Sequence, residues 1–342
     1  MGQPLRVGII GYGSIGKVHE EVLSHCEGVT VAAIAGRSAA RPPGLTADWH
    51  ADYRELLRRP DIDLVVICTP SGLHGPQALE ALEAGKHVVI EKPMALRLDE
   101  ARAVIGCARR RGLFLSVISQ RRMEPPHRYL KEAIASGRLG RPVLGEALVR
   151  WYRPQSYYDS ADWRGTLALD GGALMNQGIH LVDLLLWLMG PVTSVSAHTA
   201  TRTHRMEAED TATASLRFES GALGLIAATT AAHPGFPAEL NLFFERGSVL
   251  LSGSQVLRWE VPDLPPPPKA EPATGGASDP RAIGNAGHLA QWQEILDALR
   301  YRRRPLVAGE DGLAALALVL AIYESSQTGR AVRPGLEPLG RE

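Results

Sequence analysis

The sequence predicts two domains: an N-terminal α/β domain with a doubly wound parallel sheet, and a C-terminal α+β domain with a large, mostly antiparallel open sheet. Three observations lead to this fold class. The chain has 342 residues, more than one hydrophobic core usually holds. Short apolar strands alternate with helical segments from Leu5 to Ile118. From Val143 onward, apolar and polar residues alternate with a period of two, which is typical of antiparallel strands.

The composition excludes several classes of partner. The 37 basic residues balance the 37 acidic ones, so the charge favours neither nucleic acid nor an anionic membrane surface. Cys26, Cys68 and Cys107 have no pair spacing, which indicates a reducing compartment and no zinc site. The apolar runs are too short to cross a bilayer, and a strand pattern that begins by Leu5 argues against a signal peptide. We therefore expect a soluble, cytoplasmic protein that binds no metal.

A glycine-rich turn follows the first predicted strand, Leu5–Ile10, and precedes a helix that runs to about His25. In this position GxGxxG is strong evidence for a dinucleotide site. Gly11 permits the tight turn, Gly13 lets backbone N–H groups approach a pyrophosphate, and Gly16 lets helix and strand pack closely. The helix N-terminus adds the positive end of its dipole. The residues expected to contact the cofactor here are Gly11, Tyr12, Gly13, Ser14, Ile15 and Gly16.

The same turn comes close to the phosphate-binding loop of nucleoside triphosphatases, because Gly16-Lys17 follows Gly11 at the required spacing. Val18 stands where that loop needs a Ser or Thr to bind magnesium. We therefore exclude a triphosphate site.

The end of the second predicted strand, Val29–Ala35, bears on the choice between NAD and NADP. NAD sites usually place an acidic residue here to bind the ribose hydroxyls, but no carboxylate occurs between Val29 and Arg41. Arg37 can instead face a 2′-phosphate, with Ser38 as a second donor. The sequence therefore favours NADP over NAD. The alternative is that Arg37 merely stacks on adenine.

The alternation of helices and strands continues to Ile118. Helices are predicted over Asp52–Arg58, Pro76–Ala84 and Leu98–Arg111, and strands over Leu64–Cys68, His87–Ile90 and Leu113–Ile118. Thr69-Pro70-Ser71 and Glu91-Lys92-Pro93 follow two of these strands. The carboxyl ends of parallel strands form the edge where an open sheet binds its ligands.

Lys92 is a candidate catalytic residue because of this position at a strand end. A lysine there can hydrogen-bond a substrate hydroxyl or stabilise a developing alkoxide. The alternative is an ordinary surface lysine paired with Glu91.

The pattern changes after Gln120. A helix is predicted over His127–Ser136 and is followed by strands. These strands are Val143–Trp151, Val192–Thr203, Thr211–Phe218, Ala222–Ala231, Leu240–Phe244 and Ser248–Leu251. Pro262–Asn285, rich in proline and glycine, is predicted to be irregular, either mobile or a lid. Two final helices, Ala286–Arg300 and Asp311–Thr328, close the chain and can pack back on the first domain.

The stretch Asp170–Gly190 is predicted to be a bounded helix with two different stripes. The leucines at 181, 184, 185 and 188 form an apolar stripe, and the other stripe holds Asn176, His180, Asp183 and Trp187. A polar stripe beside an apolar face indicates a cavity, with His180 as a candidate catalytic residue. The alternative is that His180 and Asp183 are structural, one histidine hydrogen-bonded to one buried acid.

A loop that is both aromatic and polar, Pro154–Thr166, leads into this helix. It carries Tyr157, Tyr158, Trp163 and Arg164. We expect it to face the substrate, and the alternative is an aromatic plug that packs under a long loop.

The order of the motifs resembles the glucose–fructose oxidoreductase/inositol dehydrogenase/MocA (Gfo/Idh/MocA) family over nearly the whole chain. The matching segments are GYGSIG (11–16), TPSGLH (69–74), EKPMA (91–95), Gln120, GGALMNQGIHLVD (171–183) and AIYESSQTG (321–329). The resemblance implies an NAD(P)-binding Rossmann domain over 1–122 and a substrate-binding and oligomerisation domain over 123–342. It places Lys92 and His180 at the substrate. The further cofactor contacts that it implies are Thr69, Pro70, His74, Glu91, Lys92 and Gln120.

Two positions depart from the family pattern. Many of its sugar and inositol dehydrogenases carry aspartate four residues before the histidine, where this chain has Asn176. An amide can orient a hydroxyl but cannot ionise, so it cannot raise the basicity of the histidine. Gly36 replaces the acid that many NAD-using members carry.

The expected reaction is reversible hydride transfer between nicotinamide and a secondary carbinol of a sugar, sugar derivative or cyclitol. His180 would be the general acid/base, Lys92 would polarise the hydroxyl and Asn176 would orient it. Tyr157, Trp163, Arg164 and Asp183 are further candidates for contacting the substrate. The alternatives are a redox-neutral, NAD-dependent glycosidase and a cofactor-sensing binding protein without turnover. The resemblance also implies a homodimer or homotetramer through the C-terminal sheet.

Overall fold

The computed structural model describes residues 3–268, 277 and 284–335. These residues fold into two compact units. Of the described residues, the first unit contains 3–120 and 285–313, and the second contains 121–268, 277, 284 and 314–335. Both units thus include residues from the C-terminal part of the chain. The sequence-based domains, 1–122 and 123–342, remain a prediction.

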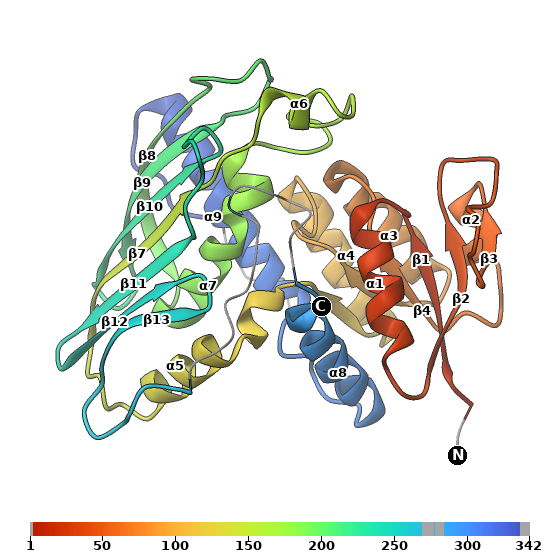
Figure 1. The fold of residues 1–342 in the computed structure, drawn as a ribbon, viewed down its shortest axis with the longest axis horizontal. Helices are drawn as coiled ribbons and strands as arrows, with labels where there is room; N and C mark the ends of the chain where they lie inside the picture. Colours follow the sequence, from red (N-terminus) through yellow and green to blue (C-terminus); the bar gives the residue numbers. More distant parts are fainter. Residues whose placement is uncertain (1–2, 269–276, 278–283, 336–342) are drawn as a thin grey trace. The chain divides into compact units, whose positions relative to one another are not determined.

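The described part of the first unit is built on a six-stranded parallel sheet in the order β3-β2-β1-β4-β5-β6. Its strands are β1 (Leu5–Ile10), β2 (Val29–Ala35), β3 (Asp48–His50), β4 (Leu64–Ile67), β5 (His87–Ile90) and β6 (Leu115–Val117). Strands β1 to β4 are labelled in Figure 1. The strand order reverses at β1, as in a doubly wound sheet, so the predicted fold class is confirmed. The sequence pattern missed β3 because its three residues, DWH, contain no apolar run.

The helices of the first unit include one from the C-terminal part of the chain. They are α1 (Ser14–Ser24), α2 (Tyr53–Leu57), α3 (His74–Glu83), α4 (Leu98–Arg111) and α8 (Ala286–Arg300). Trp292 and Ile295 of α8 are fully buried in the same apolar cluster as Ile9 and Val66 of the sheet. Burial of such a side chain stabilises the fold by roughly 1.5–3 kcal/mol. This burial explains why α8 belongs to the first unit.

The described part of the second unit contains a seven-stranded sheet in the order β13-β12-β11-β7-β10-β9-β8. Its strands are β7 (Pro142–Arg150), β8 (Val192–Ala200), β9 (Thr211–Phe218), β10 (Leu223–Thr229), β11 (Glu239–Phe244), β12 (Gly247–Ser252) and β13 (Gln255–Glu260). The β7–β10 pair is parallel and the other pairs are antiparallel, so the mostly antiparallel sheet is confirmed. Strand β13 lies at the edge and is largely exposed, which is why it lacks the alternation of a half-buried strand.

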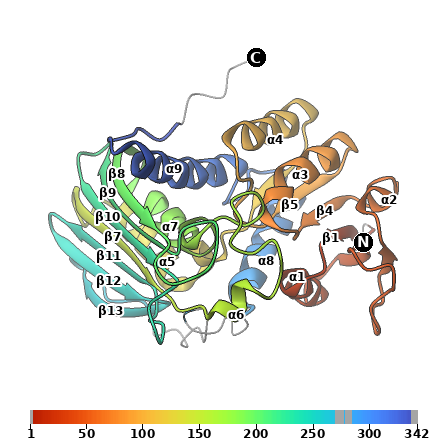
Figure 2. The ribbon, with the colours of Figure 1, turned by 90° about the horizontal axis from the view of Figure 1, so that it is seen from above.

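Helices cover one face of this sheet (Figure 2). They are α5 (Pro125–Ala135), α7 (Ile179–Met189) and the second-unit part of α9 (Gly309–Thr328), and a short helix, α6 (Gln155–Tyr158), lies in the preceding loop. Gly145 of β7 faces α7: a Cβ atom there would lie 2.9 Å from the Leu185 side chain and 3.1 Å from that of Met189. The apolar stripe predicted for α7 is therefore the packed face.

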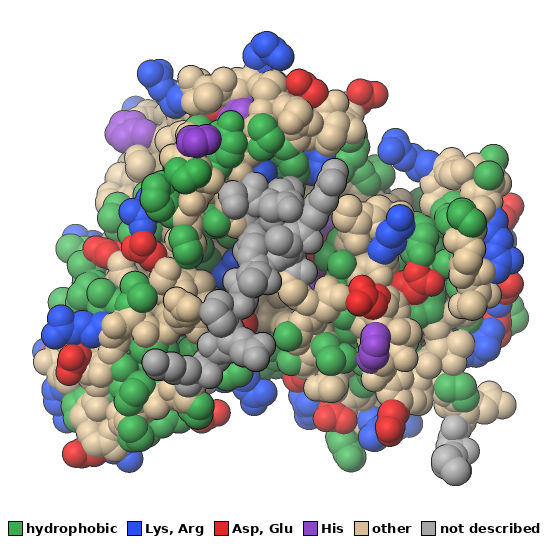
Figure 3. Space-filling view, in the orientation of Figure 1, with side chains coloured by type: hydrophobic (Ala, Val, Ile, Leu, Met, Phe, Trp, Pro, Cys, Tyr) green, Lys and Arg blue, Asp and Glu red, His purple; other side chains and the backbone are tan. Residues whose placement is uncertain are grey.

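The surface gathers no charge of one sign on the face drawn in Figure 3, where acidic and basic side chains are interspersed. Among the residues that the structure describes, no helix is long and apolar enough to cross a membrane.

The predicted helix before Gly190 is present, but it is not α-helical throughout. A π-helical segment, η3 (Ala173–Gly178), comes first, and α7 follows. Asn176 lies in η3 and not in α7, so the expectation of one continuous α-helix that carries Asn176 together with His180 and Trp187 is wrong. π-helical segments are rare and often lie at functional sites.

Glu209 explains why the chain leaves α-helical geometry here. Its backbone carbonyl accepts the Ala173 N–H at 2.8 Å, and its Oε1 accepts the Leu174 N–H at 2.8 Å and the Tyr323 hydroxyl at 3.0 Å. A Cβ atom at position 172 would lie 1.7 Å from Glu209 Oε2, so this close approach requires Gly172. The start of η3 is thus set by a tertiary contact.

Glu209 should make stability depend on pH. Burial raises the pKa of its carboxyl to about 7, from 4.5 when exposed. The folded chain then retains a proton between about pH 4.5 and 7 that the unfolded chain releases, so stability falls as pH rises through this window. At about 1.4 kcal/mol per pKa unit, the total loss is about 3 kcal/mol.

We predict that Glu209→Gln removes this pH dependence, because the amide keeps the Oε1 acceptor and does not ionise. The free energy of unfolding is measured with urea between pH 5 and 8. As pH increases, the wild type should lose stability and the variant should not, so the difference between variant and wild type should grow in favour of the variant. Glu219→Gln, at an exposed glutamate, is the control and should follow the wild type. A Glu209→Gln profile parallel to the wild type would contradict the prediction.

Candidate functional site

The glycine turn after β1 fits the pyrophosphate of a dinucleotide. Gly11 has φ +94°, and a Cβ atom there would lie 2.7 Å from the Cys68 carbonyl. A Cβ atom at Gly16 would lie 2.2 Å from the Gly11 carbonyl oxygen, whereas one at Gly13 would meet no described atom within 4 Å. Gly13 is also the N-cap of α1 and provides no side-chain cap, which leaves the first N–H groups of α1 for a phosphate. Tyr12, Ser14 and Ile15 complete the turn.

Trp49 of β3 occupies the space beside Gly36 at the end of β2. Its indole N–H donates to the Ser38 carbonyl at 3.0 Å, and its ring lies edge-on to that of Tyr12, with centroids 6.0 Å apart. A Cβ atom at position 36 would lie 2.4 Å from the Trp49 ring. Trp49 thus explains why glycine stands at position 36, and the exposed Arg37 follows it.

His74 joins the two strand ends at which the sequence places cofactor contacts. Its ring nitrogens lie 2.7 Å from the Pro93 carbonyl and 2.7 Å from the Thr69 carbonyl. Burial lowers the pKa of His74, and a neutral ring donates to one carbonyl at a time. The Thr69 hydroxyl donates to Gln77 at 2.6 Å, and Pro70 precedes a short 3₁₀ helix, Ser71–Leu73. The structure thus brings Thr69, Pro70 and His74 together.

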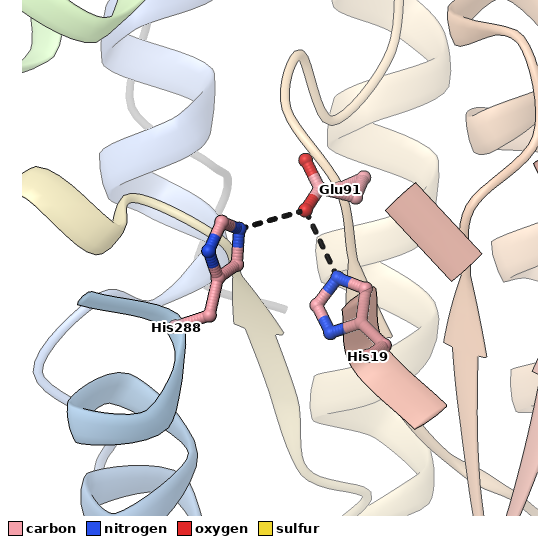
Figure 4. A group of neighbouring side chains, drawn as sticks. All are labelled: His19, Glu91 and His288. Carbon is pink, nitrogen blue, oxygen red and sulfur yellow. Dashed lines mark hydrogen bonds and ion pairs between the residues drawn. The ribbon is translucent and has the colours of Figure 1, made fainter. Parts of the chain in front are cut away.

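Glu91 is buried at the end of β5. One of its oxygens faces the His19 ring (Figure 4). The other oxygen accepts the Lys92 backbone N–H at 3.1 Å. Gln120 ends the first unit, and its buried side-chain oxygen accepts no hydrogen bond from the described residues. Such an acceptor is what a ligand donor can satisfy. The cofactor roles of Glu91, Lys92 and Gln120 remain predictions.

In the second unit, Asn176 is held by side chains on both sides of its amide. Its Nδ2 donates to the buried Asp170 carboxylate, and its Oδ1 accepts from Gln177 at 3.0 Å. These partners fix which amide atom is nitrogen and which is oxygen. A carboxylate therefore does contact this position: Asp170, six residues earlier, whose other oxygen accepts the Gly165 N–H at 2.7 Å.

The predicted substrate loop joins the same network through its tyrosine. The Tyr157 hydroxyl accepts from Gln177 at 3.3 Å and from Arg164 at 2.6 Å. The Arg164 guanidinium lies over the rings of Tyr157 and Trp163, 4.2 and 4.6 Å from their centroids. A second guanidinium, that of the buried Arg153, lies 5.6 Å from the Tyr157 centroid. Burial raises the pKa of Tyr157, so its hydroxyl keeps its proton.

His180 and Asp183 both lie buried on α7. The Asp183 carboxylate accepts two hydrogen bonds from the buried Arg122 guanidinium, at 2.8 and 2.6 Å. Removing one partner of such a pair typically lowers the stability of the fold by about 3–5 kcal/mol. Asp183 therefore has a structural role. The structural alternative drawn from the sequence paired Asp183 with His180 and did not include Arg122. A contact of Asp183 with substrate and a catalytic role of His180 remain predictions.

Several residues of these sites were missing from the sequence analysis. Trp49, Asp170, Gln177 and Glu209 belong to the environments described above. Gln177 lies inside the motif at 171–183 and Asp170 directly before it, so their position is a signal that was available. Trp49 and Glu209 lie far along the chain from the residues they contact, and no sequence pattern links them.

Comparisons with known proteins match two long segments of the chain to one family. Residues 5–119 match the family described as "Oxidoreductase family, NAD-binding Rossmann fold", and residues 127–250 match "GFO/IDH/MocA C-terminal domain". The chain is 34% identical to the uncharacterized oxidoreductase YrbE of Bacillus subtilis, over 76% of this chain and 77% of YrbE. It is 30% identical to the 1,5-anhydro-D-fructose reductase of Ensifer adhaerens, over 81% of each chain.

A solved structure extends the likeness over 98% of this chain and 100% of the other. It is the WlbA dehydrogenase of Bordetella pertussis in complex with NADH and UDP-GlcNAcA, with a TM-score of 0.86 and 34% sequence identity. The chain therefore belongs to the Gfo/Idh/MocA family of NAD(P)-dependent oxidoreductases, with an N-terminal Rossmann domain and the C-terminal domain of that family.

Proposed function

We propose that this oxidoreductase transfers a hydride between nicotinamide and a secondary hydroxyl or ketone of a sugar, sugar derivative or cyclitol. The observation that carries the proposal is the fixed polar network around Asn176, which joins Asp170, Gln177 and Tyr157 beside the helix of His180. Alternating donors and acceptors of this kind suit a polyol. The named relatives support it, since one is a reductase of a sugar derivative and another binds a nucleotide sugar.

The proposed chemistry assigns one task to each side chain. Bound NAD(P) supplies the hydride acceptor at nicotinamide. In oxidation, the hydroxyl of the substrate gives its proton to His180 while its carbinol carbon gives up the hydride, and reduction returns both. Lys92 stabilises the negative charge that develops on the oxygen, and Asn176 orients the hydroxyl.

Arg164 favours a substrate with an acidic group. Its guanidinium group lies over the Tyr157 ring and donates to the Tyr157 hydroxyl, whereas the buried Arg153 donates to the backbone carbonyls of Tyr152 and Ala277. Guanidinium groups bind carboxylates and phosphates through paired N–H donors. The substrates to test first are therefore sugar acids and nucleotide sugars, followed by neutral sugars and inositols.

We also propose that the protein prefers NADP. Arg37 and Ser38 follow β2, where no carboxylate is present to bind the ribose hydroxyls. The contact between Gly36 and Trp49 supports this, because a side chain at position 36 would collide with the indole. An NAD-type aspartate therefore cannot simply be added there.

A second copy of the chain is the partner that we propose for the C-terminal sheet. Opposite the helix-covered face, Phe243, Leu144 and Leu223 form an apolar row across β11, β7 and β10. Leu223 is 52% exposed, and Leu225, two residues on, is 39% exposed. An apolar sheet face of this kind usually marks an interaction site.

To test the function, the purified protein is mixed with NAD or NADP and with a panel of sugar acids, nucleotide sugars, neutral sugars and inositols. The absorbance of the nicotinamide is then followed. We predict that one substrate class reduces the nicotinamide cofactor. His180→Ala should lower turnover about 10²–10⁴-fold while its affinity for the cofactor stays unchanged. His198→Ala, at an exposed histidine of β8, is the control. Full activity of His180→Ala would refute the assigned role, and glycoside hydrolysis without net reduction would favour the redox-neutral alternative.

The cofactor proposal predicts how two pairs of variants behave. Arg37→Ala should lose affinity for NADP but not for NAD, whereas Arg111→Ala, at an exposed helix end, should change neither. Gly36→Asp alone should weaken both cofactors because of the Trp49 ring, and Gly36→Asp with Trp49→Ala should favour NAD. Dissociation constants from fluorescence titration decide this. If the wild-type protein binds NAD as tightly as NADP, the proposed preference for NADP is wrong.

The oligomer proposal predicts a dimer or tetramer for the wild type in analytical ultracentrifugation. Leu223→Asp with Leu225→Asp should dissociate it, because a desolvated carboxylate has no partner in an apolar interface. Leu167→Asp, at a leucine that is 54% exposed outside the sheet, is the matched control. Unchanged circular dichroism must accompany dissociation, and a monomeric wild type would contradict the proposal.

A further inference from the structure

Three buried ionisable side chains meet inside the first unit (Figure 4). They are His19 of α1, Glu91 at the end of β5 and His288 of α8, and each is at most 4% exposed. His19 Nε2 lies 3.0 Å from Glu91 Oε1, and His288 Nε2 lies 3.7 Å from the same oxygen. Neither the glycine turn nor the proposed chemistry assigns a role to these histidines.

Trp292 fixes the protonation state of His19. The Trp292 indole N–H lies 2.9 Å from His19 Nδ1, and an indole N–H can only donate. His19 Nδ1 must therefore carry a lone pair, which leaves the single ring proton on Nε2. That proton is donated to Glu91 Oε1. Burial lowers the pKa of His19, in agreement with a neutral ring.

The second oxygen of Glu91 connects this series of hydrogen bonds to the backbone of Lys92. Glu91 Oε2 accepts the Lys92 N–H at 3.1 Å. Although burial opposes the charge, the hydrogen bond from His19 keeps the pKa of Glu91 well below its usual range. An ionised carboxylate offers acceptors only, so every link has one direction: Trp292 donates to His19, and His19 and Lys92 donate to Glu91.

We propose that His19, Glu91 and Trp292 are positioning residues that hold the backbone of Lys92 for the reaction. This inference rests on the proposed function, in which Lys92 stabilises the reacting oxygen. The chain of bonds ties α8, from the C-terminal part of the sequence, to the strand end that carries Lys92. A side chain held by such supporting bonds keeps the geometry that catalysis needs.

The same three side chains also have the composition of a metal site, since their ligand atoms all lie within 4.8 Å of one another. A metal on His19 Nε2 would need the lone pair there, and the proton would move to Nδ1. Nδ1 would then direct a proton at the indole N–H of Trp292, which cannot accept it. The bond from Trp292 therefore favours the hydrogen-bonded chain over the metal.

The first test reads the tautomer directly, without any substrate. Protein with histidine labelled with nitrogen-15 should show His19 as the neutral Nε2–H tautomer at neutral pH. Trp292→Phe keeps an aromatic ring and removes the donor, so His19 Nδ1 should be able to take a proton and the single tautomer should be lost. Trp259→Phe, which removes an indole donor to the Leu264 carbonyl in the second unit, is the matched control.

The second test reads the position of Lys92. His19→Leu should speed hydrogen exchange at the Lys92 amide and lower kcat about tenfold or more, the effect of losing one supporting hydrogen bond to a charged group. KM and the cofactor dissociation constant should stay within about twofold. His19→Gln, which keeps an N–H donor, should recover most of both properties and also covers the case in which His19→Leu fails to fold.

Three results would overturn the proposal. One is His19 in the Nδ1–H or doubly protonated form in the wild type. Another is a Lys92 amide exchange rate and kcat that do not change when His19 loses its donor. The third is stoichiometric zinc binding that raises the Tm of the wild type but not of His288→Ala, because it would assign the cluster to a metal. If no panel substrate is turned over, the proposed function fails, while the tautomer and exchange measurements still decide the hydrogen-bonded chain.

Discussion

A carboxylate that folding takes out of water has to be met by donors, and this requirement shapes both units. Glu91 accepts from the His19 ring and from the Lys92 backbone. Glu209 accepts from the Leu174 backbone and from the Tyr323 hydroxyl. Buried carboxyl groups of this kind add little net stability compared with apolar packing. What they do is fix a few backbone N–H groups in place, at the strand end of Lys92 and at the start of η3.

The side chains proposed to act on substrate stand on this fixed backbone. Asn176 lies in η3, and its amide is held between Asp170 and Gln177. The network continues to Tyr157 and Arg164 of the loop. Groups that are already hydrogen-bonded lose less freedom when a ligand binds, so a preorganised network binds more tightly than a mobile one. The same constraint explains the glycine at position 172, where any side chain would displace Glu209.

Local patterns predicted much of the fold. The period of two identified the strands of the second unit, and the alternation of strands and helices identified the parallel sheet. Three features escaped them. Strand β3 is too short to show a pattern, and β13 is exposed at an edge. The π-helical geometry of η3 depends on Glu209, whose contact lies more than thirty residues along the chain.

The sequence by itself determined the fold class and the glycine turn after β1, because each rests on neighbours within one turn or one strand. Only the tertiary structure decided what surrounds the candidate site residues. Trp49 beside Gly36, Arg122 on Asp183 and Trp292 on His19 all come from segments distant in the sequence. Such contacts form because buried polar groups and close-packed rings need partners in space. A contact partner can come from any position along the chain, so no local sequence pattern indicates it.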